Sequence, residues 1–164
     1  MHEPTTIAFE RLLQRHRAEI TAYLRRLLGD PHAAEDAAQD TWLRAHRAYG
    51  RLPPDANARA WLYRIATNRA LTVLRARKTS VRRTSAIDLD ALPIRHDLEG
   101  GLALAAVARA VARLPAKQRA ALVARRFHDL DYDEIGATLG CSAESARANV
   151  HQAVRKLRTW LERT

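Results

Sequence analysis

The sequence is poor in residues that cross-link or interrupt a chain. Its one cysteine, Cys141, excludes an internal disulfide and a Cys-x-x-Cys metal site. Only six glycines and six prolines occur among 47% apolar residues, which argues against wholesale disorder. Aromatic residues make up 5%, and continuous β-branched runs are missing. These features favour an all-α fold over an all-β or α/β fold.

Long hydrophobic segments are also lacking. The first residues carry neither the charged nor the apolar region of a secretory signal. The most apolar run, residues 102–112, is short and is interrupted by Arg109. We therefore expect a cytoplasmic protein without membrane insertion.

Positive charge is abundant but unevenly spread. The 164 residues hold 28 Lys and Arg against 18 Asp and Glu, a net charge of +10. Residues 59–83 contain eight basic residues and no acidic one, whereas residues 30–40 contain four acids and no Lys or Arg. Acids dominate again between residues 88 and 99. This asymmetry predicts separate surfaces for separate partners.

Apolar spacing and capping signals divide the chain into two helical domains. Asp30-Pro31 is a cap followed by a first-turn proline, and Gly29 and Gly50 end helices. The pattern predicts helices over 6–28, 31–49 and 57–78, a loop over 50–56, a linker over 79–101 and further helices over 102–114 and 115–128. We therefore assign residues 1–78 and 102–164 to two small domains, joined by a flexible linker.

A helix-turn-helix is the most specific pattern in the second domain. Asp131 and Glu134 form a predicted capping box, Gly140 breaks that helix, and Ser142 caps a last helix through Leu161. The outward face of a recognition helix contacts base edges and phosphates. An ordinary solvated amphipathic helix is the alternative. The candidate DNA-binding residues here are Ser142, Glu144, Ser145, Arg147, Ala148, His151 and Arg155.

The third helix has two interpretations. Its arginines could form a solvated face while its aromatic residues pack. However, no acid occurs between residues 56 and 86, and a solvated helix usually mixes charges. Basic residues beside aromatic rings suit single-stranded nucleic acid, so we favour that function. The candidates are Arg59, Trp61, Arg64, Asn68, Arg69 and Arg75.

The acidic second helix would repel DNA and should face solvent or a protein. Its candidate protein-binding residues are Glu35, Asp36, Gln39 and Asp40. Trp42, on the same helix, could equally be a core residue.

Four ordered motifs resemble one family. They are the stretch from Ala34 to Ala45, the stretch from Ala60 to Asn68, Leu114-Pro115-Ala116-Lys117-Gln118-Arg119, and the helix-turn-helix from Tyr132 to Leu157. Together they resemble the extracytoplasmic-function sigma factors of bacterial RNA polymerase, over nearly the whole chain. The resemblance implies a promoter-specificity subunit that is not an enzyme and needs no cofactor or metal.

The resemblance also implies roles for each part. The acidic helix would bind the clamp helices of the polymerase β′ subunit. The third helix and the loop over 50–56 would melt and read the minus-ten promoter element. The second domain would read the minus-thirty-five element and touch the β flap, and the linker would run towards the RNA exit path. An anti-sigma factor contacting both domains is the expected inhibitor. The free chain is then expected to be extended, and compact only when inhibited.

The sequence departs from the family pattern on the recognition helix and in the turn before it. Ala146, Ala148, Asn149 and Gln152 replace more usual residues of the recognition helix, so the promoter sequence is not transferable from the family. Cys141 is interpreted as buried and inert rather than as a redox sensor.

Two other classes of protein were considered as alternatives. A one-component helix-turn-helix regulator would leave the first domain unexplained. A helical enzyme would need a catalytic constellation, and the scattered histidines offer none.

Overall fold

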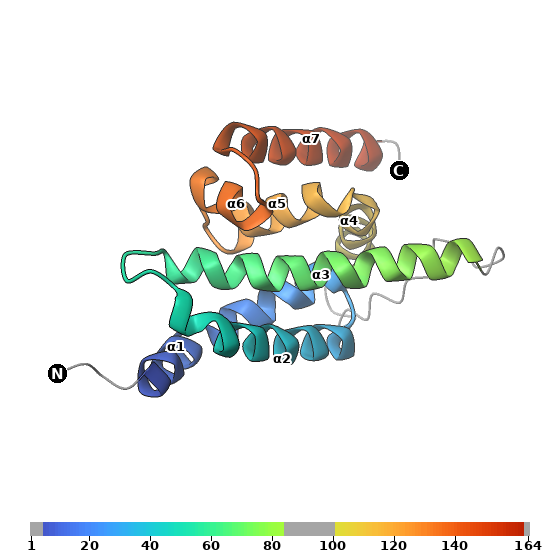
Figure 1. Cartoon of the computed structure of the whole chain (residues 1–164). Coiled ribbons are helices and arrows are strands. Elements are labelled where there is room, and N and C mark those ends of the chain that lie inside the picture. Colours follow the sequence, from blue (N-terminus) through green and yellow to red (C-terminus); the bar gives the residue numbers. More distant parts are fainter. Residues whose placement is uncertain (1–4, 84–100, 163–164) are drawn as a thin grey trace.

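The computed structural model describes residues 5–83 and 101–162, and these residues are all-helical (Figure 1). The predicted all-α class is confirmed. The described residues contain seven α-helices, one short 3-10 helix and no strand. In chain order the elements are α1 (Thr5–Leu28), α2 (Pro31–Ala48), η1 (Tyr49–Arg51), α3 (Ala58–Arg83), α4 (Gly101–Arg113), α5 (Ala116–Phe127), α6 (Tyr132–Leu139) and α7 (Ala143–Leu161).

The predicted helix boundaries differ most at the end of the third helix. The sequence pattern places that end near Lys78, but α3 continues to Arg83. Residues 79–83, which the pattern assigns to the linker, are therefore helical. The remaining linker, with the path that the resemblance implies for it, falls on residues 84–100, which lie outside the described residues.

In the first domain, a sharp turn folds α2 back against α1. Gly29 adopts a positive φ of 67°, and the Asp30 side chain accepts a hydrogen bond from the His32 backbone N–H at 3.0 Å. Pro31 is the first residue of α2, as predicted. The buried face of α2 consists of small residues, Ala34, Ala37, Ala38, Thr41 and Ala45. These small side chains let α2 pack closely on α1 and α3, and the acidic residues Glu35 and Asp36 are exposed to solvent.

The second domain begins its helix-turn-helix with the predicted capping box. Asp131 accepts a hydrogen bond from the Glu134 backbone N–H at 2.8 Å, and the Glu134 carboxylate accepts one from the Asp131 backbone N–H at 3.0 Å. Gly140 ends α6 with a φ of 66°, and the Ser142 hydroxyl caps α7 by accepting from the Ser145 N–H at 3.1 Å. Local sequence signals therefore place both helices correctly.

The turn of this motif is tightly packed. A Cβ added to Gly136 would lie 2.7 Å from the Cys141 carbonyl oxygen and 3.2 Å from the Ala143 nitrogen. Only glycine leaves room for this backbone approach. Cys141 is half-buried and packs against the core, so it is less buried than the sequence suggests.

The two domains pack against each other. α3 lies between α2 on one side and α5 and α6 on the other (Figure 1). The fully buried Leu130 and the buried rings of Tyr23 and Tyr63 belong to one apolar cluster that spans both domains. The His128 ring lies edge-on to these two tyrosines, with centroids at 5.4 and 5.8 Å. The expectation of an extended free chain is therefore wrong for this structure, because the shared apolar seam favours closure.

Candidate nucleic-acid and protein interfaces

The acidic face of α2 is only partly free. Glu35, Asp36 and Gln39 are exposed, whereas the Asp40 carboxylate forms ion pairs with Arg69 at 2.7 Å and with Arg44 at 3.4 Å. Glu35 pairs with Arg25 of α1 at 3.0 Å. Asp36 has no ion pair with another described side chain.

One apolar residue on this face was missed by sequence reasoning. Leu43 is 57% exposed and lies seven residues after Asp36 and four after Gln39, on the same helical face. This spacing in the sequence could have identified Leu43, because an exposed leucine on the same helical face as acidic residues suits a contact with another protein. Trp42, by contrast, is half-buried and packs on the core, which supports its structural alternative.

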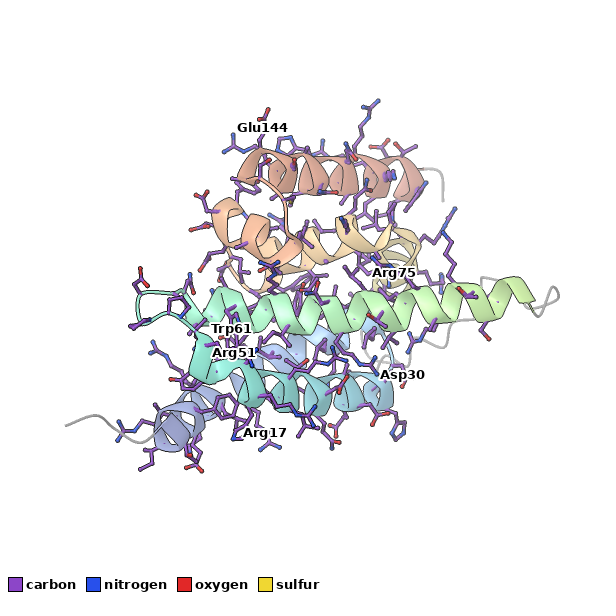
Figure 2. The ribbon with its side chains drawn as sticks, in the orientation of Figure 1. Arg17, Asp30, Arg51, Trp61, Arg75 and Glu144 are labelled. Carbon is purple, nitrogen blue, oxygen red and sulfur yellow. The ribbon has the colours of Figure 1, made fainter. Side chains whose placement is uncertain are left out.

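On α3, three of the predicted nucleic-acid residues share an exposed face. Arg64, Asn68 and Arg75 are exposed at spacings of four and seven residues. Trp61 is half-buried near Tyr49, with ring centroids 6.4 Å apart, and Figure 2 shows it at the end of α3 near η1. This face combines guanidinium groups, an amide and an aromatic ring, the groups that hold unpaired nucleotides.

The other two α3 candidates face the protein instead. Arg69 pairs with Asp40, so a predicted polymerase residue and a predicted DNA residue contact each other. The Arg59 guanidinium donates to Glu19 at 3.0 Å and to the His128 carbonyl at 2.7 Å. The six predicted residues therefore do not form one surface.

The recognition helix α7 presents its predicted face to solvent. Glu144, Arg147, Ala148, His151 and Arg155 are all exposed, and Figure 2 shows Glu144 at the outer surface of the molecule. The Arg147 guanidinium lies over the Tyr132 ring at 5.0 Å, which orients it.

The two predicted serines, Ser142 and Ser145, make hydrogen bonds with each other at the start of α7. The Ser142 hydroxyl both caps α7 and donates to the Ser145 hydroxyl at 3.0 Å. Ser142 therefore begins the helix rather than presenting a free donor.

The half-buried carboxylate of Glu19 organises the polar groups where the two domains meet. Burial raises the pKa of Glu19, but hydrogen bonds from Arg59, His16 and Tyr63 outweigh burial, so the net effect is a lowered pKa. The charge on Glu19 in turn raises the pKa of Tyr63, after burial as the larger cause. Glu19 is therefore ionised and holds the Arg59 side chain in place.

The histidine at the domain seam predicts a pH-dependent stability. Burial, followed by the positive charge of Arg26, lowers the pKa of His128 from 6.5 to about 4; Arg59 also lowers it, and Glu19 and Asp129 oppose this. A lowered histidine pKa stabilises the packed state above pH 6.5, and this stabilisation is lost as the pH falls towards 4. We expect the free energy of urea unfolding to drop by on the order of 1 kcal/mol from neutral pH to about pH 5.

The control for this prediction is His128→Gln, whose side chain carries no charge at either pH. Its unfolding free energy should vary less with pH than that of the unaltered chain. Parallel pH profiles for the two proteins would contradict the assigned role of His128.

Comparisons with known proteins identify the family. The chain matches the sequence profile of sigma-70 region 2 over residues 12–80 and that of sigma-70 region 4 over residues 104–157. It is 31% identical to the ECF RNA polymerase sigma factor SigM of Mycobacterium tuberculosis, over 92% of this chain and 75% of SigM. The chain belongs to the ECF sigma factors. Members of this family direct promoter recognition and transcription initiation by RNA polymerase and are not enzymes.

Further relatives and solved structures agree. SigE of Mycolicibacterium smegmatis is 33% identical over 94% of this chain, which spans 62% of the length of SigE. RpoE of Bartonella quintana, solved in complex with the anti-sigma factor NepR, shares the fold with a TM-score of 0.77 and 24% identity, over 94% of this chain and 97% of RpoE. CnrH, solved with the cytosolic domain of CnrY, gives a TM-score of 0.70 and 23% identity, over 96% of this chain and 89% of CnrH.

Membership of this family decides between the sigma factor and the one-component regulator as the function of the chain. A one-component helix-turn-helix regulator is the wrong interpretation, because sigma-70 region 2 covers α1 to α3. Within residues 5–83 and 101–162, no helix is both long and apolar enough to span a membrane. In the same ranges, no group of three His, Cys, Asp or Glu side chains could hold a metal ion.

Proposed function

We propose that this chain gives core RNA polymerase its promoter specificity through three separate helices. One observation carries this proposal. The chain exposes three surfaces of different chemistry, an acidic face on α2, a basic face with an aromatic ring on α3 and a mixed polar face on α7. A simple DNA-binding regulator needs only the last of them.

The α2 face is proposed to bind the clamp helices of the β′ subunit. Asp36 and Gln39 supply the exposed polar groups, and Leu43 adds an apolar anchor one turn further on. Glu35 contributes negative charge at the edge of this α2 face. Asp40 acts mainly by positioning α3 through its ion pair with Arg69.

The exposed α3 face is proposed to hold the melted minus-ten element. Arg64 and Arg75 would neutralise phosphates and Asn68 would hydrogen-bond a base. Trp61 and the segment over 50–56 lie at the same end of the helix and are proposed to hold a flipped base.

The second domain is proposed to read the minus-thirty-five element as duplex. Arg147, His151 and Arg155 would contact bases and phosphates from α7, while Ala148 permits close approach without a hydrogen bond. On α4, Leu104 and Val107 are 51% and 39% exposed, and they are proposed to meet the β flap.

Replacement of Arg64 and Asn68 by Ala tests the minus-ten assignment. The double variant should form open complexes roughly tenfold to a hundredfold less well, because a phosphate contact and a hydrogen bond to an unpaired base are lost. Permanganate footprinting of holoenzyme on promoters of the host measures opening, and gel shift measures duplex binding.

Arg17→Ala is a matched control, since Arg17 is an exposed arginine on α1 (Figure 2). Duplex binding should change less than twofold in either variant. Open complexes at the level of the unaltered protein would count against the assignment of α3.

We further propose that the chain works in the cytoplasm, where RNA polymerase acts, and that a separate anti-sigma factor binds it. The fold shared with RpoE, which was solved in complex with an anti-sigma factor, supports this partner. The occupied surfaces would be the α2 face and the second domain, because covering both blocks polymerase and promoter at once.

A further inference from the structure

A buried glutamine lies beneath the recognition helix. Gln118 is in the first turn of α5, and α5 packs directly against α7 (Figure 1). Only 8% of Gln118 is exposed, and its side-chain Nε2 donates a hydrogen bond to Oε1 of Gln152 on α7 at 2.7 Å. Its own Oε1 is buried and accepts no hydrogen bond from the described residues. The side-chain contact of Gln118 is therefore directed at the recognition helix.

This arrangement is not explained by stability. A buried amide oxygen without a partner costs free energy, and an apolar side chain of the same length would avoid that cost. Gln152, in contrast, is exposed, so water could satisfy its Oε1 if Gln118 did not. The hydrogen bond between the two amides therefore serves to orient Gln152 rather than to hold the domain together.

The bond decides which edge of the Gln152 amide faces outward. Oxygen and nitrogen lie on different sides of a planar amide group. Because Oε1 of Gln152 is held towards the buried Gln118, its NH2 group is directed away from α5. Gln152 thus presents two N–H donors, while its carbonyl is already engaged.

Gln152 lies beside the face of α7 that is proposed to read DNA. It is exposed, four residues after Ala148 and three before Arg155. It also borders an open groove of about 370 Å³ whose other lining residues are Arg155, Lys156, Thr159 and Trp160. The two cations of this groove suit DNA phosphates, so a base edge can approach the amide while the DNA backbone is neutralised.

We propose that Gln118 is a positioning residue for promoter reading, which fixes Gln152 as a hydrogen-bond donor to a guanine of the minus-thirty-five element. The inference rests on the proposed reading of this element by α7. In the major groove guanine offers two acceptors, N7 and O6, whereas adenine offers one acceptor and one donor, thymine one acceptor and cytosine a donor. An unrestrained glutamine pairs best with adenine, because its carbonyl accepts from the adenine amino group while its NH2 group donates to N7. With its carbonyl held by Gln118, Gln152 favours guanine instead.

Gln118→Met removes the donor and leaves Gln152 in place. Methionine has a length similar to that of glutamine and suits a buried site, so the variant should fold with a Tm at least equal to that of the unaltered chain. Gln152 is then free to turn its carbonyl towards DNA. Thr159→Ala is the matched control, because Thr159 lines the same groove and its hydroxyl donates to the Arg155 carbonyl of its own helix at 3.1 Å.

The test uses holoenzyme assembled from the full-length chain and core RNA polymerase. Duplexes randomised across the minus-thirty-five region of a host promoter are selected by binding and sequenced. The unaltered chain should prefer guanine over adenine roughly tenfold at one base position, and Gln118→Met should prefer adenine over guanine there by a similar factor. Preferences at the other positions should change less than twofold, and Thr159→Ala should select the same sequences as the unaltered chain.

A double-variant cycle separates positioning from a structural role. Gln152→Ala should reduce the preference at that base position to less than twofold, and adding Gln118→Met to it should change nothing further. Loss of a guanine preference at every position alike in Gln118→Met would show that Gln118 only supports the fold of the second domain, which would overturn the inference.

Two further outcomes separate failure of this inference from failure of the proposed function. Clear base preferences that include no guanine dependent on Gln152, or a guanine preference that survives Gln118→Met, would overturn the role of Gln118 alone. A selection by the unaltered holoenzyme with no preferred base anywhere in the region would refute the proposed reading of the minus-thirty-five element, and the inference with it.

Discussion

Asp36→Arg is expected to weaken binding to core RNA polymerase at least roughly a hundredfold, a loss of about 3 kcal/mol. The proposed polymerase contact lies on the exposed face of α2, where a reversed charge turns attraction into repulsion. Asp36 makes no ion pair with another described side chain, so the helical fold should persist within about 0.5 kcal/mol. Titration of the labelled chain with core polymerase measures the affinity, and circular dichroism measures the fold.

Glu10→Arg is the matched control for this variant. Glu10 is an exposed acid on α1 of the same domain, and its reversal changes the net charge by the same amount. Its affinity for core polymerase should stay close to that of the unaltered chain. Equal losses in both variants would indicate a general charge effect, and no loss with Asp36→Arg would refute the contact through α2.

Gly136→Ala is expected to destabilise the second domain by about 1–3 kcal/mol. The added Cβ would meet the Cys141 carbonyl oxygen at 2.7 Å, and backbone cannot rotate aside as a side chain can. The turn would have to open, which also strains the hydrogen bond from the Cys141 N–H to the Gly136 carbonyl at 2.9 Å. A thermal melt should show the loss as a fall of several degrees in Tm, roughly 2–4 °C per kcal/mol for a chain of 164 residues whose two domains share one core.

Loss of duplex binding should accompany this destabilisation, because α7 is held by the same turn. Gly50→Ala is the control, since a Cβ at Gly50 meets no atom within 4 Å. A Gly136→Ala protein with the Tm of the Gly50→Ala protein would show that the turn relaxes at no cost.

Helix positions and their outward faces could be predicted from neighbouring residues. Asp30-Pro31, the capping box at Asp131 and the pair Gly140 and Ser142 each act over three or four residues, and each proved to be where the signal placed it. The exposed face of α7 followed from helical periodicity for the same reason. Caps and periodicity are local interactions, so they are present in the sequence itself.

The end of α3 could not be predicted in this way. The apolar pattern fades near Lys78, but Thr79-Ser80-Val81 contains no glycine or proline, and the helix continues to Arg83. Backbone hydrogen bonds propagate a helix without a buried face, provided that no residue stops them. Loss of periodicity was therefore an incomplete signal for a helix end.

By itself, the sequence determined two helical domains, a helix-turn-helix and separate acidic and basic helices, because local spacing and composition decide these features. Only the tertiary structure decided which charges remain available. Arg69 is engaged by Asp40 of α2 and Arg59 by His128, 69 residues away in the chain, whereas Arg64 and Asn68 stay exposed. Contacts between residues so far apart depend on how the helices pack, and the shared apolar seam that sets this packing has no local signature.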